Sequence, residues 1–231
     1  AAARADTIVC TTDFAGEEFA RINQPVRKIP LGVDLVQFHP SRRSDFWHAQ
    51  FGASVVLLMC SRLSKEKEPA FALDVLRECR RRGIDAHLVI AGDGPMAATL
   101  QRQSLGMPVT MLGFVSSRSE LARILASANV ILAPGPIETF GLAALEALAS
   151  GTPAIVNKSS ALPEVVGLSA GRALPLEAGA WATAVDMLTA EQHGYRTVAR
   201  LRAERFTWQT SARRMLAMHG LKFRELEVQA A

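Results

Sequence analysis

The sequence is poor in the features that mark several large classes of protein. Among its 231 residues are one Tyr, three Trp and three Cys. Surfaces that bind single-stranded nucleic acids combine aromatic residues, on which bases stack, with basic residues that contact the phosphates. In this sequence aromatic and basic residues are not interleaved in that way. The composition therefore gives little support to a nucleic-acid surface, and we expect no nucleic-acid partner.

Cysteine clusters and long apolar runs are also missing. Cys10, Cys60 and Cys79 have no C-x-x-C spacing, and the five His show no ligand spacing. This argues against a disulfide framework and a metal cluster, and it suits a reducing compartment. Apolar runs such as Val55–Cys60 are far too short to span a bilayer, and we recognise no signal peptide. We therefore expect a cytoplasmic protein without a metal.

The charge is small and spread thinly. The net charge is +4, and the basic residues that cluster fall on predicted helices: Arg77, Arg80, Arg81, Arg82, Arg200, Arg202 and Arg205. Such residues usually form solvated helix surface or complement the helix dipole. They are also compatible with a lipid surface, and hence with peripheral attachment at the inner membrane face.

What the sequence does contain is a regular alternation of short apolar segments and amphipathic ones. The predicted strands are Val55–Cys60, His87–Ala91, Val109–Leu112, Asn129–Ala133 and Ala154–Asn157. The predicted helices between them are Pro69–Arg82, Pro95–Leu105, Ser119–Ser127 and Leu142–Ser150. This rhythm predicts an α/β fold, a doubly wound, mostly parallel Rossmann-like sheet with right-handed crossovers.

The flanking segments are less regular. Upstream we predict a strand over Thr7–Thr12, a helix capped by Asp13 and running to about Ile22, a strand over Val26–Ile29 and a helix over Ser44–Phe51. Downstream we predict three helices, over Trp181–Leu188, Tyr195–Phe206 and Thr207 to about Leu226.

The most informative stretch lies between residues 133 and 157. A Pro-Gly-Pro turn leads into a short loop that carries Glu138, and the Leu142–Ser150 helix follows. The free N–H groups and the positive end of the helix dipole predict an anion site. On one continuous helix Glu138 and Glu146 would be roughly 80° apart, but with Glu138 on the loop both can face one ligand. Because the neighbours of Glu146 are small or apolar, it either lies on a solvent stripe or accepts from a hydroxyl-rich ligand.

Other candidate groups follow the remaining strands. Arg62 and Lys67 come after the first strand of the regular series, and the Gly92-Asp93-Gly94-Pro95 turn follows the second, with Pro95 opening a helix. The backbone of Gly113-Phe114-Val115 follows the third and could bracket a flat base. Ligands of such sheets bind beyond the carboxyl ends of the strands. Two cations, a glycine turn, a backbone edge and an anion site together suit a sugar nucleotide.

These loops resemble a known family. S-R-L-S-K-E-K, A-G-D-G-P, L-G-F-V and P-I-E-T-F-G-L-A-A-L-E-A-L-A-S-G-T-P together resemble the carboxyl-terminal half of GT-B glycosyltransferases, family 4 of the retaining enzymes. The resemblance extends from G-V-D-x-x-x-F-x-P at 32–40 to R-A-E-R-F-T-W at 202–208. Each motif is weak alone, whereas the motifs together in this order are specific.

The resemblance implies roles for particular residues. Arg62 and Lys67 would hold the donor diphosphate, Glu146 would accept from the ribose hydroxyls, and Glu138 would contact the transferred sugar. The amides of the helix tip would cradle phosphate or sugar, and the backbone at Val115 would meet the base. The implied donor-binding set is Arg62, Lys67, Val115, Glu138, Thr139, Phe140, Gly141, Leu142 and Glu146. Glu138, Arg62 and Lys67 would also act in catalysis, in place of a metal.

The sequence departs from the family pattern in places. Ser159-Ser160 stands where a glycine pair is usual, and Leu31 where Asn is commoner. From the resemblance we expect the family's amino-terminal domain, which supplies the acceptor site, to lie outside this sequence. We therefore expect residues 1–30 to be a remnant of that domain with its linker, 31–206 to bind the donor, and 207–231 to be a helix that crosses back. We expect this chain to bind the nucleotide and not to catalyse transfer alone.

The donor and the reaction class have alternatives. The segments A-P-G-P-I-E-T-F-G and S-S-A-L-P-E-V resemble those of actinobacterial mannosyltransferases that act on phosphatidylinositol or related glycolipids with GDP-mannose. Nothing in the residues requires guanine over uracil, so a UDP-sugar is the other candidate. An epimerase would share the nucleotide site, and a non-catalytic nucleotide-binding domain would share the fold. An NAD-dependent oxidoreductase fits Gly92–Ala97 as G-x-G-x-x-A, but the next strand ends without the acidic residue that it needs.

Overall fold

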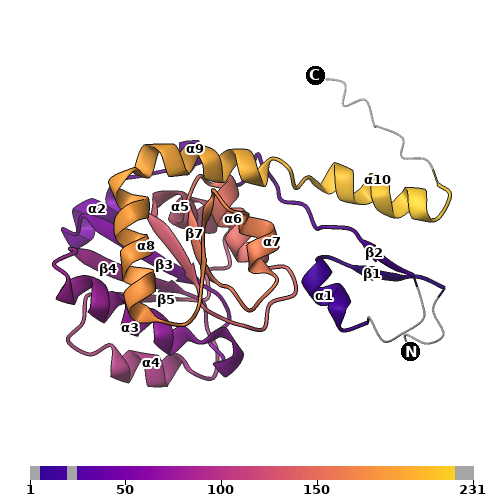
Figure 1. Ribbon diagram of the computed structural model, residues 1–231. Helices are drawn as coiled ribbons and strands as arrows, with labels where there is room; N and C mark the ends of the chain where they lie inside the picture. The colour runs from indigo at the N-terminus through magenta and orange to yellow at the C-terminus, as the bar shows by residue number, and fades with distance from the viewer. Residues whose placement is uncertain (1–5, 20–24, 222–231) are drawn as a thin grey trace.

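The fold centres on one parallel sheet with helices on both faces (Figure 1). The computed structural model describes residues 6–19 and 25–221. The sheet has six strands in the order β5-β4-β3-β6-β7-β8. These strands are β3 (Val55–Cys60), β4 (Ala86–Ala91), β5 (Val109–Gly113), β6 (Val130–Ala133), β7 (Ala154–Asn157) and β8 (Gly171–Leu174). The predicted doubly wound α/β class is confirmed.

Helices form the two outer layers. They are α2 (Phe46–Phe51), α3 (Pro69–Arg81), α4 (Ala97–Gln103), α5 (Arg118–Ser127), α6 (Leu142–Ala149), α7 (Leu162–Val166), α8 (Ala178–Ala190) and α9 (Gln192–Ala203). Two apolar clusters lie on opposite faces of the sheet, because successive side chains of a strand alternate between faces. On β3, Val56 and Leu58 pack into one cluster and Leu57 into the other. A strand buried on both faces explains the unbroken apolar run that predicted it.

The strand order places a crevice at the centre of the sheet. β3 pairs with β4 on one side and with β6 on the other. The chain therefore leaves β3 in one direction through β4 and β5, and then returns to β6 in the other direction. The loops after β3 and β6 diverge at this switch point, which is where ligands of open α/β sheets bind. Those two loops carry Arg62, Lys67 and Glu138.

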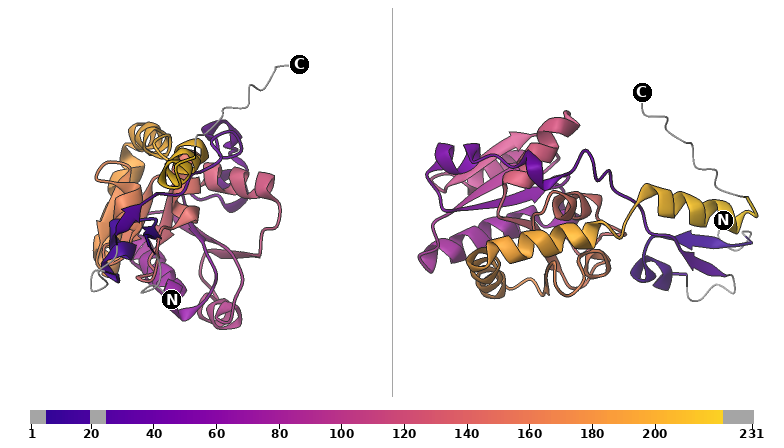
Figure 2. Two further views of the ribbon diagram at one scale, coloured as in Figure 1. Left: turned by 90° about the vertical axis from the view of Figure 1, so that its right-hand side faces the viewer. Right: turned by 90° about the horizontal axis from the view of Figure 1, so that it is seen from above.

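The amino-terminal segment forms a small unit of its own. β1 (Ile8–Cys10) and β2 (Val26–Lys28) pair in parallel, with α1 (Asp13–Glu17) between them. The last described helix, α10 (Trp208–Met218), lies beside this unit (Figures 1 and 2). Two connections cross at close range, since a Cβ added to Gly32 would lie 2.2 Å from the Trp208 nitrogen. The predicted division at residues 30 and 206 stays a prediction.

Several predicted boundaries were wrong for identifiable reasons. Thr12, not Asp13, caps α1, because its side chain accepts from the Ala15 amide. That helix ends at Glu17, and residues 20–22 of the prediction lie outside the described residues. Pro95 does not open a helix, since α4 begins at Ala97 after a turn. α10 ends at Met218, before a left-handed Gly220, and the predicted continuation from 222 to 226 lies outside the described residues.

The prediction also missed short elements. α7 and β8 had not been expected, and neither had two turns of 3₁₀ helix, η2 (Pro40–Arg42) and η3 (Lys65–Lys67). Segments of three to five residues carry too few positions to show a hydrophobic period. One of them, η3, carries Lys67 and so contributes to the site.

Candidate functional site

The candidate site is the crevice at the switch point. The ends of β3 and β6, the loop after β6 and the first turn of α6 line it. Among its lining residues are Cys60, Lys67, Gly135, Glu138 and Gly141. The structure thus brings together residues from segments about 70 positions apart, as the strand order requires.

The central contact in the crevice is an ion pair between Lys67 and Glu138. The Lys67 Nζ lies 2.5 Å from Glu138 Oε1 and donates to the Ile137 carbonyl at 3.1 Å. The two side chains are 21% and 23% exposed, so a ligand in the crevice can reach both. A charge-assisted contact of this kind contributes more than a neutral hydrogen bond. The pair holds the ammonium group and the carboxylate at fixed places in the crevice.

Arg62 is held differently. Its side chain is exposed and makes no hydrogen bond with any residue that the structure describes. Its positive charge helps to lower the pKa of Glu66, after the larger effects of the hydrogen bond from Ser64 and a backbone hydrogen bond. Since no protein partner binds the guanidinium group in the described part of the chain, the group is available to an anion.

The glycine turn after β4 supports this loop and does not open a helix. A Cβ on Gly92 would lie 1.9 Å from the Ser61 carbonyl oxygen, and one on Gly94 would lie 2.5 Å from the Leu63 carbonyl oxygen. The Leu63 amide donates to the Asp93 carbonyl at 2.9 Å. The glycines therefore allow the backbone of one loop to pack on the other. This role, and the place of the turn after β4 instead of β3, remove the basis for the oxidoreductase alternative.

The tip of α6 has the features of an anion site. Gly141 occupies the cap position with φ +85°, and no side chain caps the helix. A Cβ at Gly141 would lie 2.0 Å from Leu162 Cδ2, so both the space and the backbone require glycine. The first amides of α6 are left without a side-chain acceptor and can donate to a bound anion.

The three predicted donor-site residues next to Gly141 differ in their burial and contacts. Phe140 is buried and packs edge-on against Phe206, and its side chain does not line the crevice, so only its backbone can serve a ligand there. Leu142 is 41% exposed. The Thr139 carbonyl accepts from the hydroxyls of Thr11 and Thr12, each at 2.9 Å. Of these three predicted donor-site residues, Thr139 thus contacts the amino-terminal unit.

Glu146 does not lie on a solvent stripe. Its side chain is only 12% exposed, and Oε1 accepts from the Arg118 guanidinium at 3.1 Å. Burial raises the pKa of the Glu146 carboxyl, and Arg118 opposes that rise. The Cys60 thiol, which lines the crevice, has its pKa raised to about 12 by burial and by the charge of Glu146. Glu146 is therefore close to the crevice that Glu138 lines.

Sequence reasoning missed Arg118. It is the first residue of α5, its guanidinium carbon lies 4.8 Å from the centre of the Phe38 ring, and it makes the hydrogen bond to Glu146. The signal that could have found it is its place three residues after Val115, at the same edge of the sheet. Val115 itself is half-buried against the core, with its backbone in the loop between β5 and α5.

The Ser159-Ser160 pair stabilises its own loop. The buried Ser160 hydroxyl donates to the Asn157 carbonyl at 2.8 Å and accepts from the Leu162 amide at 3.2 Å. The Ser159 amide donates to Asn157 Oδ1 at 2.8 Å. The two serines thus shape the turn that leads from β7 to α7.

The described residues contain neither a metal cluster nor a membrane-spanning helix. Within residues 6–19 and 25–221, no three His, Cys, Asp or Glu side chains are grouped as a metal would need. No helix in these ranges has both the length and the apolar character to cross a bilayer. Cys10, Cys60 and Cys79 are free thiols.

Comparison with known sequences identifies relatives of this chain. The sequence profile of the family described as "Glycosyl transferases group 1" matches residues 42–195. A GDP-mannose-dependent alpha-(1-6)-phosphatidylinositol dimannoside mannosyltransferase of Mycobacterium tuberculosis is 48% identical over 223 residues. That match covers 95% of this chain and 58% of the relative, so the chain spans a little over half of it. A GDP-mannose-dependent alpha-mannosyltransferase of Corynebacterium glutamicum is 38% identical over 54% of this chain and 29% of its own length.

Solved structures agree on the fold. Sucrose-phosphate synthase from Thermosynechococcus elongatus superposes with a TM-score of 0.77 at 24% identity, covering 94% of this chain and 58% of that one. Anabaena HepE in complex with UDP-glucose gives 0.79 at 18% identity, covering 95% and 65%. The carboxyl-terminal domain of a group 1 glycosyl transferase from Francisella tularensis gives 0.63 at 20% identity, covering 75% of this chain and 95% of that domain.

The six-stranded parallel sheet, the solved structures that superpose on it and the matching relatives agree with the carboxyl-terminal half of a GT-B enzyme. The family profile covers two thirds of the sequence. The chain belongs to the glycosyl transferases of group 1.

Proposed function

We propose that this chain is the donor-binding part of a retaining mannosyltransferase that uses GDP-mannose and acts on a phosphatidylinositol-type glycolipid. The mycobacterial relative, 48% identical over 95% of the chain, supports both the donor and the acceptor class. The single observation that carries the proposal is the Lys67–Glu138 pair, set at 2.5 Å in the crevice beside the uncapped tip of α6.

The electrostatics of the crevice suit the departure of a diphosphate. As the sugar–oxygen bond breaks, negative charge builds up on the diphosphate and positive charge on the sugar. In our proposal Arg62, Lys67 and the amides of the helix tip neutralise the leaving group, as preorganised donors do. Each charge-assisted contact is worth about 1.5–3 kcal/mol. In the same proposal Glu138, which is paired with Lys67, stabilises the developing cation of the sugar.

The nucleoside would lie on the other side of α6. Glu146 is buried and presents a carboxylate, which a ribose with two hydroxyl donors would satisfy. Arg118 now occupies one carboxylate oxygen, so we expect it to move when the ribose binds or to share the carboxylate with it. The backbone at Val115 follows the edge of β5 and would border the base.

The acceptor would be bound elsewhere in the complete protein. The chain spans 58% of the mycobacterial relative, and we propose that the remainder corresponds to the amino-terminal domain with the acceptor site. Peripheral attachment to the inner face of a membrane would then bring the enzyme to a lipid acceptor. We expect the 231-residue chain to bind the nucleotide without transferring mannose.

The test is a transfer assay. The chain is fused behind the part of the mycobacterial relative that it does not cover, and is incubated with GDP-mannose and phosphatidylinositol dimannoside. We expect a product one mannose larger, with the α configuration retained, and loss of that product in a Glu138→Gln variant of the same fusion. Conversion of GDP-mannose to an epimeric sugar nucleotide, or transfer from UDP-glucose alone, would overturn the proposal.

A further inference from the structure

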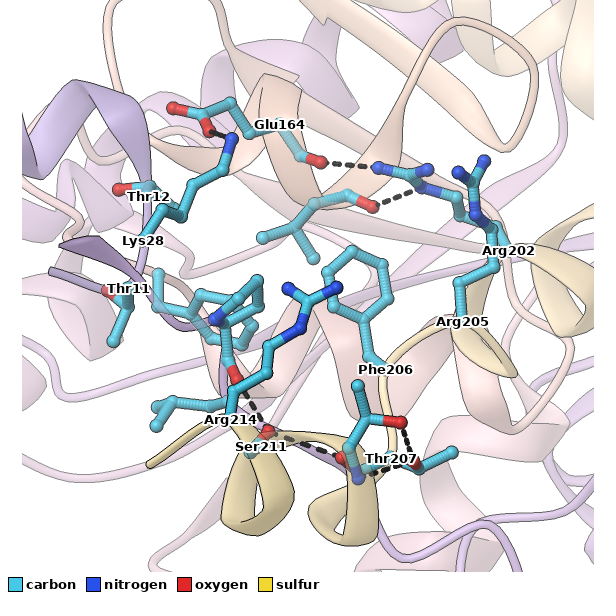
Figure 3. Close-up of a pocket in the computed structure, with 15 residues that line it drawn as sticks. Thr11, Thr12, Lys28, Glu164, Arg202, Arg205, Phe206, Thr207, Ser211 and Arg214 are labelled. Atoms are coloured by element: carbon cyan, nitrogen blue, oxygen red, sulfur yellow. Dashed lines mark hydrogen bonds and ion pairs between the residues drawn. The ribbon is translucent and has the colours of Figure 1, made fainter. Parts of the chain in front are cut away.

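A second cavity lies where the β1–β2 unit, α7 and the start of α10 meet (Figure 3). Its volume is about 210 Å³, and it shares no lining residue with the crevice at the switch point. Four basic side chains and one carboxylate line it: Lys28, Arg202, Arg205, Arg214 and Glu164. This excess of positive charge in a concave site needs an explanation.

Two of the four cations have protein partners. Lys28 forms ion pairs with Asp13 and with Glu164, the latter at 3.3 Å. Arg202 donates to the Val165 carbonyl at 2.8 Å and to the Glu164 carbonyl. These contacts tie the amino-terminal unit and α9 to α7, so Lys28 and Arg202 are accounted for by the fold.

Arg205 and Arg214 have no such partner in the part of the chain that the structure describes. Among residues 6–19 and 25–221, no carboxylate or carbonyl accepts from either guanidinium group. The charge of Arg205, together with burial, lowers the pKa of Arg202, so the two cations repel each other. Figure 3 shows the Arg214 side chain extending into the middle of the cavity and the Arg205 side chain running beside Arg202. An anion between these side chains would relieve the repulsion.

The rest of the lining suits a phosphate group. The hydroxyls of Thr207, Thr210 and Ser211 lie at the start of α10. Thr207 donates to the Thr210 hydroxyl and Ser211 to the Pro30 carbonyl, so the Thr210 hydroxyl is the one left to donate to a ligand. Phe140 and Phe206 supply an apolar side. Guanidinium groups bind phosphate oxygens through paired N–H donors, and hydroxyls add further hydrogen bonds. A phosphate monoester carries up to two negative charges and three terminal oxygens, so it matches two guanidinium groups in charge and in acceptors better than a carboxylate with one charge.

We propose that this cavity binds the phosphate group of a phosphate ester, through Arg205 and Arg214, independently of the donor nucleotide. The ester comes either from a small soluble metabolite or from the headgroup of a phospholipid. Since β2 and α10 both contribute to the lining, the bound phosphate also holds the two crossing segments together.

The first test is calorimetric titration of the 231-residue chain with inorganic phosphate, at constant ionic strength and with chloride as the reference ion. We expect saturable binding that weakens at least tenfold in an Arg205→Ala/Arg214→Ala double variant. Both side chains are exposed, so the variant should fold, and its thermal unfolding checks this. A matched control, Arg81→Ala/Arg123→Ala, removes the same charge from helix surfaces and should bind as the unchanged chain does.

An Arg62→Ala variant separates this cavity from the crevice. It should keep phosphate binding at the cavity. The proposal is overturned by equal binding in the Arg205/Arg214 double variant, by a loss confined to Arg62→Ala, or by the absence of saturable phosphate binding to the unchanged chain.

Sedimentation with vesicles assigns the source of the phosphate. One set of vesicles contains phosphatidylcholine alone and the other also contains phosphatidylinositol. Sedimentation that depends on phosphatidylinositol and is lost in the double variant assigns the site to a lipid headgroup. Phosphate binding without such sedimentation assigns it to a soluble phosphate ester.

Discussion

At the scale of single residues, the two basic side chains after β3 differ in how the protein holds them. Lys67 is set by its ion pair with Glu138, whereas the Arg62 side chain has no hydrogen bond among the described residues. Because the Arg62 guanidinium group is exposed and has no hydrogen-bond partner in the described part of the chain, it can turn toward a ligand without breaking a contact, whereas Lys67 must share its ion pair.

Glu146 gives a prediction on pH. Burial raises its pKa above the ordinary 4.5, so the folded chain retains a proton that the unfolded chain has already released. Its contribution to the free energy of unfolding is therefore highest below pH 4.5 and is lost as the pH rises through the raised value. A Glu146→Gln variant lacks this loss, so it should gain stability relative to the unchanged chain between pH 4.5 and pH 7. Urea unfolding at several pH values measures the difference.

The control for Glu146 is a carboxylate of similar position on a helix but with greater exposure. Glu120 lies on α5, is 40% exposed and is paired with Arg123. Its Gln variant should not show the same relative gain. Identical pH dependence in Glu146→Gln and in the unchanged chain would contradict the assignment.

At the scale of elements, the site depends on loops that fit backbone to backbone. A Cβ added to Gly92 would lie 1.9 Å from the Ser61 carbonyl oxygen. A Cβ added to Gly135 would lie 2.9 Å from the Glu66 carbonyl oxygen. The three connections after β3, β4 and β6 therefore hold one another. A substitution in the loop after β4 should therefore shift the position of Arg62, although the substituted residue does not contact the Arg62 side chain.

Gly92→Ala tests this coupling. The added methyl collides with backbone, so we expect a loss of at least about 2 kcal/mol in the free energy of unfolding. We also expect weaker binding of a nucleoside diphosphate, because the loop that carries Arg62 must shift. Chemical denaturation and titration measure the two effects.

Gly83→Ala is the matched control for Gly92→Ala. Gly83 has φ +81° and nothing within 4 Å of an added Cβ, so only the left-handed backbone resists the change. We expect a loss of about 1–2 kcal/mol and no change in nucleotide affinity. An equal loss of affinity in both variants would refute the coupling between the loops.

The elements also show how far the sequence could predict the structure. β3 and β7 have the predicted bounds, because each is a continuous apolar run with clear breaks. The site residues Lys67 and Glu138 could be placed in one crevice from the parallel order alone. Arg118 could have been placed at the same edge from its position after β5, but its contact with Glu146 could not be predicted, because that contact depends on side-chain direction at the start of α5. The packing role of Gly92 could not be predicted either, since it depends on a neighbouring loop.

At the scale of the whole molecule, Glu164 joins the amino-terminal unit to the domain built on the six-stranded sheet. Its carboxylate accepts from the amides of Asp13 and Phe14 at 3.0 and 2.8 Å, and it pairs with Lys28. It thereby caps the start of α1 from a distance of 150 residues along the chain. The hydroxyls of Thr11 and Thr12 reach the carbonyl of Thr139, next to Glu138.

Removing the Glu164 carboxylate should release this unit. A hydrogen bond to a charged group is worth about 1.5–3 kcal/mol, so in Glu164→Ala the amides of Asp13 and Phe14 should exchange with solvent at least tenfold faster. Amides in β3 should be unaffected, because the core does not involve Glu164. Hydrogen exchange followed by NMR measures both. Unchanged exchange at Asp13 and Phe14, or faster exchange in β3, would count against this role.

The measurement that tests the central claim most directly is calorimetric titration with GDP, UDP and ADP, without and with Mg²⁺. The account predicts binding of one nucleotide, GDP, in a 1:1 ratio and without a requirement for the metal. It predicts binding weakened about ten- to a hundredfold in Arg62→Ala, but not in Arg77→Ala, whose exposed side chain lies on α3. An Arg62→Ala variant that binds GDP as tightly as the unchanged chain would contradict the account.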